Sequence, residues 1–333
     1  MRSLLLILLS AAAACAASSP FDGRWDITIK DDSSRAWWLG IEGVGTPDAK
    51  GTFISDYWGD LNKIDEISLQ GGQLVFGFRH KEDGKEIHNV YTAKIEQGKL
   101  VGTAVREGSS GEPIHFIGVR APVIVDKDDG VWHEGKPVKL FDGKSAAGWR
   151  SLTPDKPFGW TVEDGILKSA GGASNLITER KFWNFALHVE FRLAQHSNSG
   201  IGLRARYEVQ ILDDYGRPPS THGNGALYSR ILPTENASKP AGEWQTYDIR
   251  LVGRQVTVVL NGKKVIDKGV IEGLTAIASD CEEGTAGPLI LQGDHGPVEF
   301  RSIVLTPLTK QARPLPGSAP AGGISPALPP GHA

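Results

Sequence analysis

The sequence predicts an all-β protein in which a C-terminal two-sheet jelly-roll sandwich is preceded by a small antiparallel β-barrel domain. Many short segments alternate apolar and polar residues with a period of two, which is the pattern of half-buried strands. Turn signals such as Asp83-Gly84 and Asn261-Gly262 separate these segments at close spacing. No helical periodicity of useful length appears, so both domains are expected to consist of strands and turns.

The size and charge of the chain limit the class of protein. With 333 residues it is long enough for two or three domains that each have a hydrophobic core. Charged residues make up 23% of the chain and the formal net charge is -3, which predicts neither a nucleic acid nor an anionic membrane surface as partner.

Residues 1–17 have the pattern of an export signal. Arg2 supplies the positive end, Leu4 to Leu9 the apolar run, and Ala11 to Ala17 the small-residue cleavage region. Cys15 follows a run of alanines, and the arrangement partly resembles a bacterial lipoprotein cleavage box. We therefore expect an exported protein, periplasmic or at the cell surface, either soluble or held to the membrane by a lipid anchor at Cys15.

Residues 18–125 read as the small barrel, and residues 126–136 as a polar, turn-forming linker. The opening Gly23-x-Trp25 is similar to the first strand of lipocalin-like barrels. In such barrels the tryptophan closes one end, so its role is structural and no ligand is predicted for this domain.

Residues 137–309 carry about ten further strand patterns and no long helix, as expected for a two-sheet sandwich. The clearest alternation runs from Phe185 to Leu193. Residues 310–333 are rich in Pro, Ala and Gly and are predicted to be a disordered tail.

The stretch from Ile201 to Ile211 is interpreted as one continuous strand. Its odd-numbered residues are apolar and should face a core. The other face would then carry a row of polar side chains, which is either a plain solvated face or a functional one. The row consists of Arg204, Arg206, Glu208 and Gln210.

Asp213 breaks this alternation, and a β-bulge near Leu212 would turn it back towards Glu208. The resulting Glu-x-Gln-x-x-Asp pattern resembles the Glu-x-Asp-x-x-Glu strand of laminarinase-like glucanases. Retaining glycoside hydrolysis needs two carboxylates about 5 Å apart. The amide of Gln210 at the central position therefore disfavours that mechanism.

Seven short motifs follow one another in the C-terminal part of the chain. They are Leu140-Phe141-Asp142-Gly143 with Trp149, Asn198-Ser199-Gly200-Ile201, Tyr207 to Asp213, Gly225-Ala226-Leu227-Tyr228, Asn236 to Trp244, Asn261-Gly262, and Leu291-Gln292 with His295-Gly296. By these motifs, the chain from about Val138 to Leu308 resembles the 3-keto-disaccharide hydrolase family, also described as 3-keto-glycoside lyases, of exported bacterial proteins. The resemblance implies a fold like that of concanavalin A-like lectins and glucanases.

The resemblance implies an enzyme that cleaves 3-keto-glycosides or 3-keto-disaccharides. A ketone at carbon 3 acidifies the hydrogen at carbon 2, so a base can form an enediolate that expels the substituent on carbon 1, and water then adds to the product. This route needs one base, a group that stabilises the oxyanion, and an acid for the leaving oxygen.

Glu208, Asp213 and His295 are the candidate catalytic residues, with Asp213 as the base. A divalent metal ion could bind the 3-keto and 2-hydroxyl oxygens, and Glu208 with His222 or His295 would be its ligands. The candidates for binding sugar hydroxyls are Asn198, Arg204, Gln210, Tyr228, Lys239 and Gln292.

The sequence is also compatible with two other functions. The same sandwich serves non-catalytic carbohydrate-binding modules, and an ordinary β-glucanase is the third reading. The ionisable residues Glu208 and Asp213 favour an enzyme, because a base without a catalytic role would only add a desolvation cost. No nucleotide-binding glycine motif occurs, so this chain is not expected to form the ketone itself.

Overall fold

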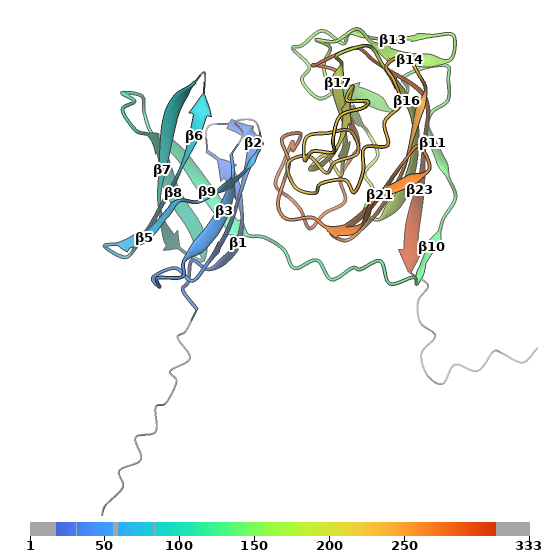
Figure 1. Ribbon diagram of the computed structural model, residues 1–333. Helices are drawn as coiled ribbons and strands as arrows, with labels where there is room; N and C mark the ends of the chain where they lie inside the picture. The colour runs from blue at the N-terminus through green and yellow to red at the C-terminus, as the bar shows by residue number, and fades with distance from the viewer. Residues whose placement is uncertain (1–17, 31, 56–58, 83, 311–333) are drawn as a thin grey trace, which may run out of the picture.

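The computed structural model of this chain describes residues 18–310, except residues 31, 56–58 and 83. Two all-β domains make up this part of the chain (Figure 1). Within it, no helix is long and apolar enough to cross a membrane. The predicted export signal with Cys15, and the predicted tail from residue 311 onwards, lie outside the described residues.

The N-terminal domain is one curled antiparallel sheet in the order β4-β3-β2-β1-β9-β8-β7-β6-β5. Most neighbours in this order are consecutive in the chain, and β9 returns to pair with β1. Among the described residues β4 and β5 are not paired with each other, so the expected closed barrel is not hydrogen-bonded all the way round. Its strands are β1 Gly23–Ile29, β2 Asp32–Glu42, β3 Lys50–Ile54, β4 Leu61–Lys63, β5 Glu66–Gln70, β6 Gln73–Glu82, β7 Lys85–Glu96, β8 Lys99–Arg106 and β9 Ile114–Arg120.

Aromatic side chains fill the inside of this sheet. Trp25 is buried, its Nε1 donates a hydrogen bond to the backbone oxygen of Phe21 (2.8 Å), and the Arg120 guanidinium lies 3.8 Å from its ring centroid. Trp37 packs edge-on against Phe53. Trp25 therefore has the structural role that its place in the first strand predicted.

The C-terminal domain is a sandwich of two antiparallel sheets, as predicted. The larger sheet has the order β13-β14-β23-β16-β19-β20-β21, with β10 and β11 also paired to β23; the smaller has the order β12-β15-β22-β17-β18. Its strands are β10 Trp132–Glu134, β11 Val138–Phe141, β12 Trp149–Ser151, β13 Trp160–Glu163, β14 Ile166–Ser169, β15 Leu176–Thr178, β16 Phe185–Leu193, β17 Asn198–Leu203, β18 Tyr207–Leu212, β19 Gln245–Val252, β20 Gln255–Leu260, β21 Lys263–Val270, β22 Ile290–Leu291 and β23 Val298–Lys310.

The alternation of single strands is confirmed in detail. Strand β16 covers the predicted Phe185–Leu193 and buries every second residue. The predicted hairpin turn is also present, with positive φ at Asn261 (51°) and Gly262 (80°). The linker is partly ordered in the sheet, because Trp132 in β10 pairs with Lys310, the last residue of β23.

The prediction of one strand from Ile201 to Ile211 is wrong, because the segment is a hairpin of β17 and β18. The chain reverses through Arg204 and Ala205, which have φ values of 53° and 59°. Only glycine adopts this region at no steric cost, so the sequence carried no turn signal. The buried Arg204 guanidinium holds the turn by donating hydrogen bonds to Trp183 O (2.6 Å) and Asn184 Oδ1 (3.0 Å).

The side-chain faces expected for this segment are nevertheless correct within each strand. Tyr207, Val209 and Ile211 lie in the core between the two sheets. Glu208 and Gln210 lie on the other face of the smaller sheet, where they are also buried. Because Glu208 and Gln210 are buried although they lie on the outer face of a sheet, other segments of the chain must cover them. The candidate site lies between these segments and the sheet.

Candidate active site

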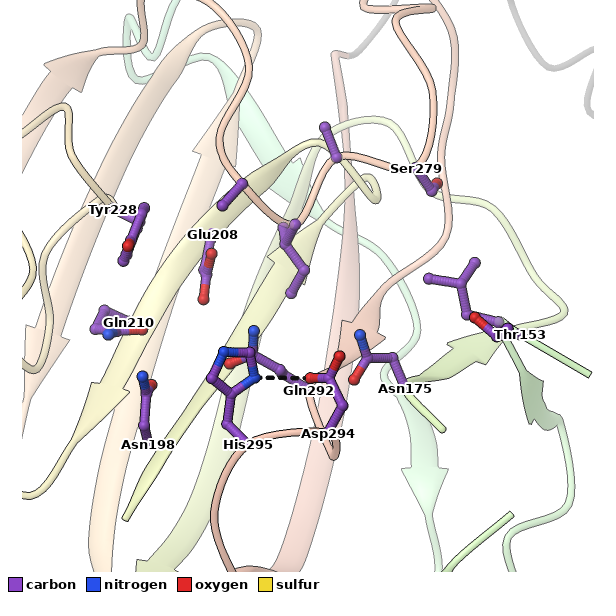
Figure 2. A pocket seen from close by; sticks show the side chains of 14 residues that line it. Thr153, Asn175, Asn198, Glu208, Gln210, Tyr228, Ser279, Gln292, Asp294 and His295 are labelled. Atoms are coloured by element: carbon purple, nitrogen blue, oxygen red, sulfur yellow. Dashed lines mark hydrogen bonds and ion pairs between the residues drawn. The ribbon is translucent and has the colours of Figure 1, made fainter. Parts of the chain in front are cut away.

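A cavity of about 390 Å³ lies over the outer face of β17, β18 and β22 (Figure 2). Polar side chains from several elements point into it. Its lining consists of Leu152, Thr153, Asn175, Asn198, Glu208, Gln210, Tyr228, Ala276, Ile277, Ala278, Ser279, Gln292, Asp294 and His295. A concave site with a few convergent polar groups is the usual form of a small-molecule site.

Glu208 is the most deeply buried acid of this cavity, with an exposed fraction of 2%. Its carboxyl group fits over the neighbouring strand because position 200 is glycine: a Cβ there would come within 2.3 Å of Glu208 Oε1. Burial raises the pKa of Glu208 to about 8, against the opposing attraction of His295. Glu208 is therefore mostly protonated at neutral pH.

His295 and Asp294 face Glu208 from the turn between β22 and β23, as Figure 2 shows. His295 Nδ1 is hydrogen-bonded to Asp294 Oδ1 at 2.8 Å, and this bond raises the pKa of His295 above its usual value. Burial alone would raise the pKa of Asp294, but its hydrogen bond to His295 and the charges of His295 and Lys156 lower it. The pair thus holds an imidazole whose Nε2 is left for other partners.

Three amide side chains in the lining have an acceptor oxygen that is buried and has no hydrogen-bond partner. They are Asn198 Oδ1, Gln210 Oε1 and Gln292 Oε1. A buried polar atom without a partner costs free energy, so native proteins rarely keep one without a reason. Hydroxyl groups of a sugar would donate to these oxygens.

Tyr228 lies beside Glu208 because its segment runs along the edge strand β18 of the smaller sheet. Tyr228 N donates to Glu208 O (3.0 Å), and Leu227 forms a bridge with Val209. Burial raises the pKa of Tyr228 to about 12, so its hydroxyl remains a hydrogen-bond donor. Behind it, burial lowers the pKa of Arg230 to about 10, which leaves the guanidinium charged at neutral pH.

Six of the predicted site residues line this one cavity. The other four predicted residues do not line it: they are Asp213, Arg204, Lys239 and His222. Those that line it are Glu208, His295, Asn198, Gln210, Tyr228 and Gln292.

Asp213 is not brought together with Glu208. The expected bulge is absent, since the pairing of β17 with β18 runs without a shift from Asn198↔Leu212 to Leu203↔Tyr207. Asp213 follows the end of β18, and its Oδ2 accepts a hydrogen bond from the backbone nitrogen of His196 (2.7 Å). This hydrogen bond stabilises the turn at His196, and Asp side chains after a strand commonly bind backbone in this way.

Two predicted sugar-binding residues have structural contacts instead. The Arg204 guanidinium is buried 3.8 Å from the ring centroid of Trp183, beyond the hairpin turn. Lys239 Nζ donates to the backbone oxygen of Trp244 (3.0 Å). Neither side chain reaches the cavity.

Glu208 and His222 do not fit a shared metal ion. His222 Nε2 is hydrogen-bonded to Asp60 Oδ1 (2.7 Å) and its Nδ1 lies 3.4 Å from Thr221 Oγ1, so both ring nitrogens have partners. Among the residues that the structure describes, no group of three or more His, Cys, Asp and Glu side chains has the arrangement of a metal site.

Sequence reasoning missed Asn175 and Asp294, which line the cavity, and Asp60 and Arg230, which lie behind it. Asp294 could have been found from its place directly before His295. Asn175 gave no such signal: its Oδ1 accepts a hydrogen bond from Gly293 N (2.8 Å) across the domain. Asp60 lies in the other domain, so no local pattern could connect it to the site.

Comparison with known proteins identifies the family of the C-terminal domain. A family model described as 3-keto-alpha-glucoside-1,2-lyase-like domain matches residues 136–306. The chain belongs to this family. The matched region contains every residue that lines the cavity.

The chain is 30% identical over 166 residues to the 3-keto-disaccharide hydrolase of Bacteroides thetaiotaomicron, a match that covers 39% of this chain and 57% of that protein. The chain thus spans little more than half the length of this relative. Among solved structures, it is similar to a protein from Parabacteroides distasonis provisionally described as a glycosyl hydrolase (28% identity, 60% of this chain and 94% of the other, TM-score 0.45). It is also similar to an endo-beta-1,3(4)-glucanase (12% identity, 58% and 95%, TM-score 0.35).

Proposed function

We propose that this chain is a carbohydrate-cleaving enzyme that acts on 3-keto-glycosides or 3-keto-disaccharides by elimination across carbons 1 and 2. The observation that carries the proposal is the pairing, in one cavity, of a carboxylic acid that is protonated at neutral pH with an imidazole oriented by a carboxylate. Such a pair of titratable groups is what acid and base assistance of one reaction requires.

His295 is the base in this proposal. Asp294 accepts a hydrogen bond from Nδ1–H of His295, so the lone pair of the neutral imidazole is on Nε2. His295 Nε2 takes the proton from carbon 2, and the electron pair of the broken C–H bond forms the enediolate with the carbon 3 ketone. Asp294 then stabilises the imidazolium that results.

Glu208 is the acid. As the enediolate collapses, the bond between carbon 1 and the glycosidic oxygen breaks, and Glu208 donates its proton to that oxygen. The product is an unsaturated 3-keto sugar, to which water adds to complete a net hydrolysis. The hydroxyl of Tyr228 can donate a hydrogen bond to the oxyanion, since its raised pKa keeps it protonated.

The partnerless oxygens of Asn198, Gln210 and Gln292 support a polyhydroxylated substrate. Since sugars carry several hydroxyl donors, one ring could satisfy all three oxygens at once. The same oxygens would also suit a non-catalytic carbohydrate-binding module, which is why the deciding experiment measures bond cleavage.

The experiment compares a 3-keto-glucoside with its unoxidised parent, each with and without a chelator, using the purified chain. Release of the aglycone from the keto sugar alone is expected, and Glu208→Gln should abolish most of it. Release from both substrates would favour an ordinary glycosidase. Binding without release from either would overturn the enzyme and leave the binding module. Loss of activity with chelator would show that the reaction needs a metal ion, held by residues other than the pair Glu208 and His222.

We further propose that the enzyme is exported, on the pattern of residues 1–17. Fractionation of cells that produce the full chain tests this, and labelling with a radioactive fatty acid tests for a lipid anchor at Cys15.

A further inference from the structure

A short segment of the N-terminal domain contacts the wall of the cavity. Asp60 Oδ1 is hydrogen-bonded to His222 Nε2 (2.7 Å), and Leu61 N donates to Ser229 Oγ (3.1 Å). Gly59 O accepts a hydrogen bond from Arg230 Nη2 (3.2 Å). Residues 59–61 of the N-terminal domain thus contact residues that precede and follow Tyr228 in the sequence of the C-terminal domain.

His222 transmits this contact to the lining. Its ring packs edge-on against the ring of Tyr228, with centroids 4.7 Å apart and an interplanar angle of 83°. Its backbone oxygen accepts a hydrogen bond from Gln210 Nε2 (3.3 Å). Edge-to-face contact constrains both rings, so fixing His222 restricts the orientation of Tyr228.

A second part of the wall, the loop that contains Gly273 and Ala276, is also in contact with the N-terminal domain. A Cβ at Gly59 would lie 2.3 Å from Ala276 Cα, and a Cβ at Gly273 would lie 2.7 Å from Trp38 Cδ2. Ala276 lines the cavity. This loop therefore has the N-terminal domain on one side and the cavity on the other.

Arg230 connects the same contact to Glu208. Its Nη2 donates to Gly59 O and to Leu274 O, and its positive charge opposes the rise in the pKa of Glu208. One of the acceptors that hold this charge, Gly59 O, thus belongs to the N-terminal domain.

We propose that the N-terminal domain completes the active site, and that Asp60 is a positioning residue which fixes Tyr228 through His222. The family match begins at residue 136, so this part of the site lies outside the family domain. The effect on catalysis rests on the proposed function, whereas the effect on Tyr228 does not.

The first test observes Tyr228 directly, in the full chain labelled with 3-fluorotyrosine. The chain has six tyrosines, and the signal of Tyr228 is assigned by its absence in Tyr228→Phe. Asp60→Ala should shift or broaden the fluorine signal of Tyr228, and Asp60→Asn, which keeps an oxygen acceptor, should do so less. The side chain of His222, which loses a hydrogen-bond partner in Asp60→Ala, is 45% exposed, so water can replace that partner.

A matched control removes another polar contact between the domains. Arg24 forms an ion pair with Glu272 (2.8 Å), and both side chains are about half exposed. Arg24→Ala should leave the Tyr228 signal unchanged. An unchanged signal in Asp60→Ala, or an equal change in Arg24→Ala, would overturn the proposal.

The second test measures kinetics on a 3-keto-glucoside. Asp60→Ala should lower kcat/KM about tenfold, since small displacements of positioning groups have effects of this order or larger. If Asp60 acts through Tyr228, adding Asp60→Ala to Tyr228→Phe should cause little further loss. Fully additive losses would overturn the route through Tyr228. A shifted fluorine signal in a chain without activity on any keto sugar would refute the proposed function and leave the contact between Asp60 and Tyr228 standing.

Discussion

The carboxyl group of Glu208 lies against Gly200 of the neighbouring strand, in space that any other side chain at position 200 would occupy. Gly200 pairs with Gln210 in the hairpin. Because Gly200 has no side chain, it leaves space on the cavity face of β17 beside the buried Glu208 and Gln210. This contact makes the backbone of β17 a part of the geometry of Glu208.

Gly200→Ala should therefore displace the Glu208 carboxyl. The added Cβ would lie 2.3 Å from Oε1 and 3.0 Å from Cδ, closer than atoms pack. We expect activity on a 3-keto-glucoside to fall about a hundredfold, which is the size of effect that a misplacement of 1 Å can have. Gly111→Ala is the control, because a Cβ there meets only Ser109 Oγ at 3.3 Å on an exposed loop. Full activity of Gly200→Ala would show that the reaction does not depend on the position of Glu208.

Glu208 should control the alkaline side of the pH profile. The acid must be protonated, and the pKa of Glu208 is raised to about 8, so kcat/KM should decline as the pH rises through this value. Glu208→Gln should lower kcat by roughly 10²-fold or more and remove this decline. A rate that instead increases through pH 8 would assign Glu208 the role of base.

Asp294 should control the acid side of the same profile. Its hydrogen bond raises the pKa of His295, and the base is active only when unprotonated. Asp294→Asn removes the negative charge, so the acid limb of kcat/KM should move to lower pH while kcat falls. Measured profiles of the two proteins check both effects. If the acid limb stays in place, His295 is not the group that titrates there.

Arg204 should affect stability and not substrate affinity. Arg204→Met leaves Trp183 O and Asn184 Oδ1 without its hydrogen bonds and removes a guanidinium that is stacked on Trp183. We expect the free energy of unfolding to fall by roughly 3 kcal/mol. KM at a temperature where the variant is folded should be close to that of the unaltered protein. Denaturant titration and substrate titration measure the two quantities, and a large rise in KM would contradict this account.

Asp26 should make stability depend on pH. Asp26 is buried between the domains and hydrogen-bonded to Glu283. Burial, and after it the negative charge of Glu283, raises the pKa of Asp26 to about 8. Because the folded-state pKa exceeds the unfolded value, the stability that Asp26 contributes is complete below about pH 4 and is lost as the pH rises towards 8.

Asp26→Asn should therefore flatten the change of the unfolding midpoint between pH 5 and pH 8 and raise the midpoint at the upper end. The exposed Asp48→Asn serves as the control and should leave the slope unchanged. Equal slopes in Asp26→Asn and the unaltered protein would contradict the assigned pKa.

The prediction of the fold from the sequence succeeded where the signal is local. Strand β16 and the Asn261-Gly262 turn follow from side-chain alternation and from backbone preferences of single residues. The prediction failed at Arg204 and Ala205, where a turn is made from residues that seldom adopt positive φ. That turn is stable because distant groups, Trp183 and Asn184, bind the arginine.

By itself, the sequence determined the all-β class, the faces of β18, and the family to which residues 136–306 belong. The tertiary structure decided that Asp213 lies outside the cavity, that Asp294 orients His295 within it, and that Asp60 comes from the other domain to hold His222. The reason is physical: alternation and turn preference act over a few residues, whereas Asp60 and His222 meet across 162 positions of the chain through packing that no local pattern encodes.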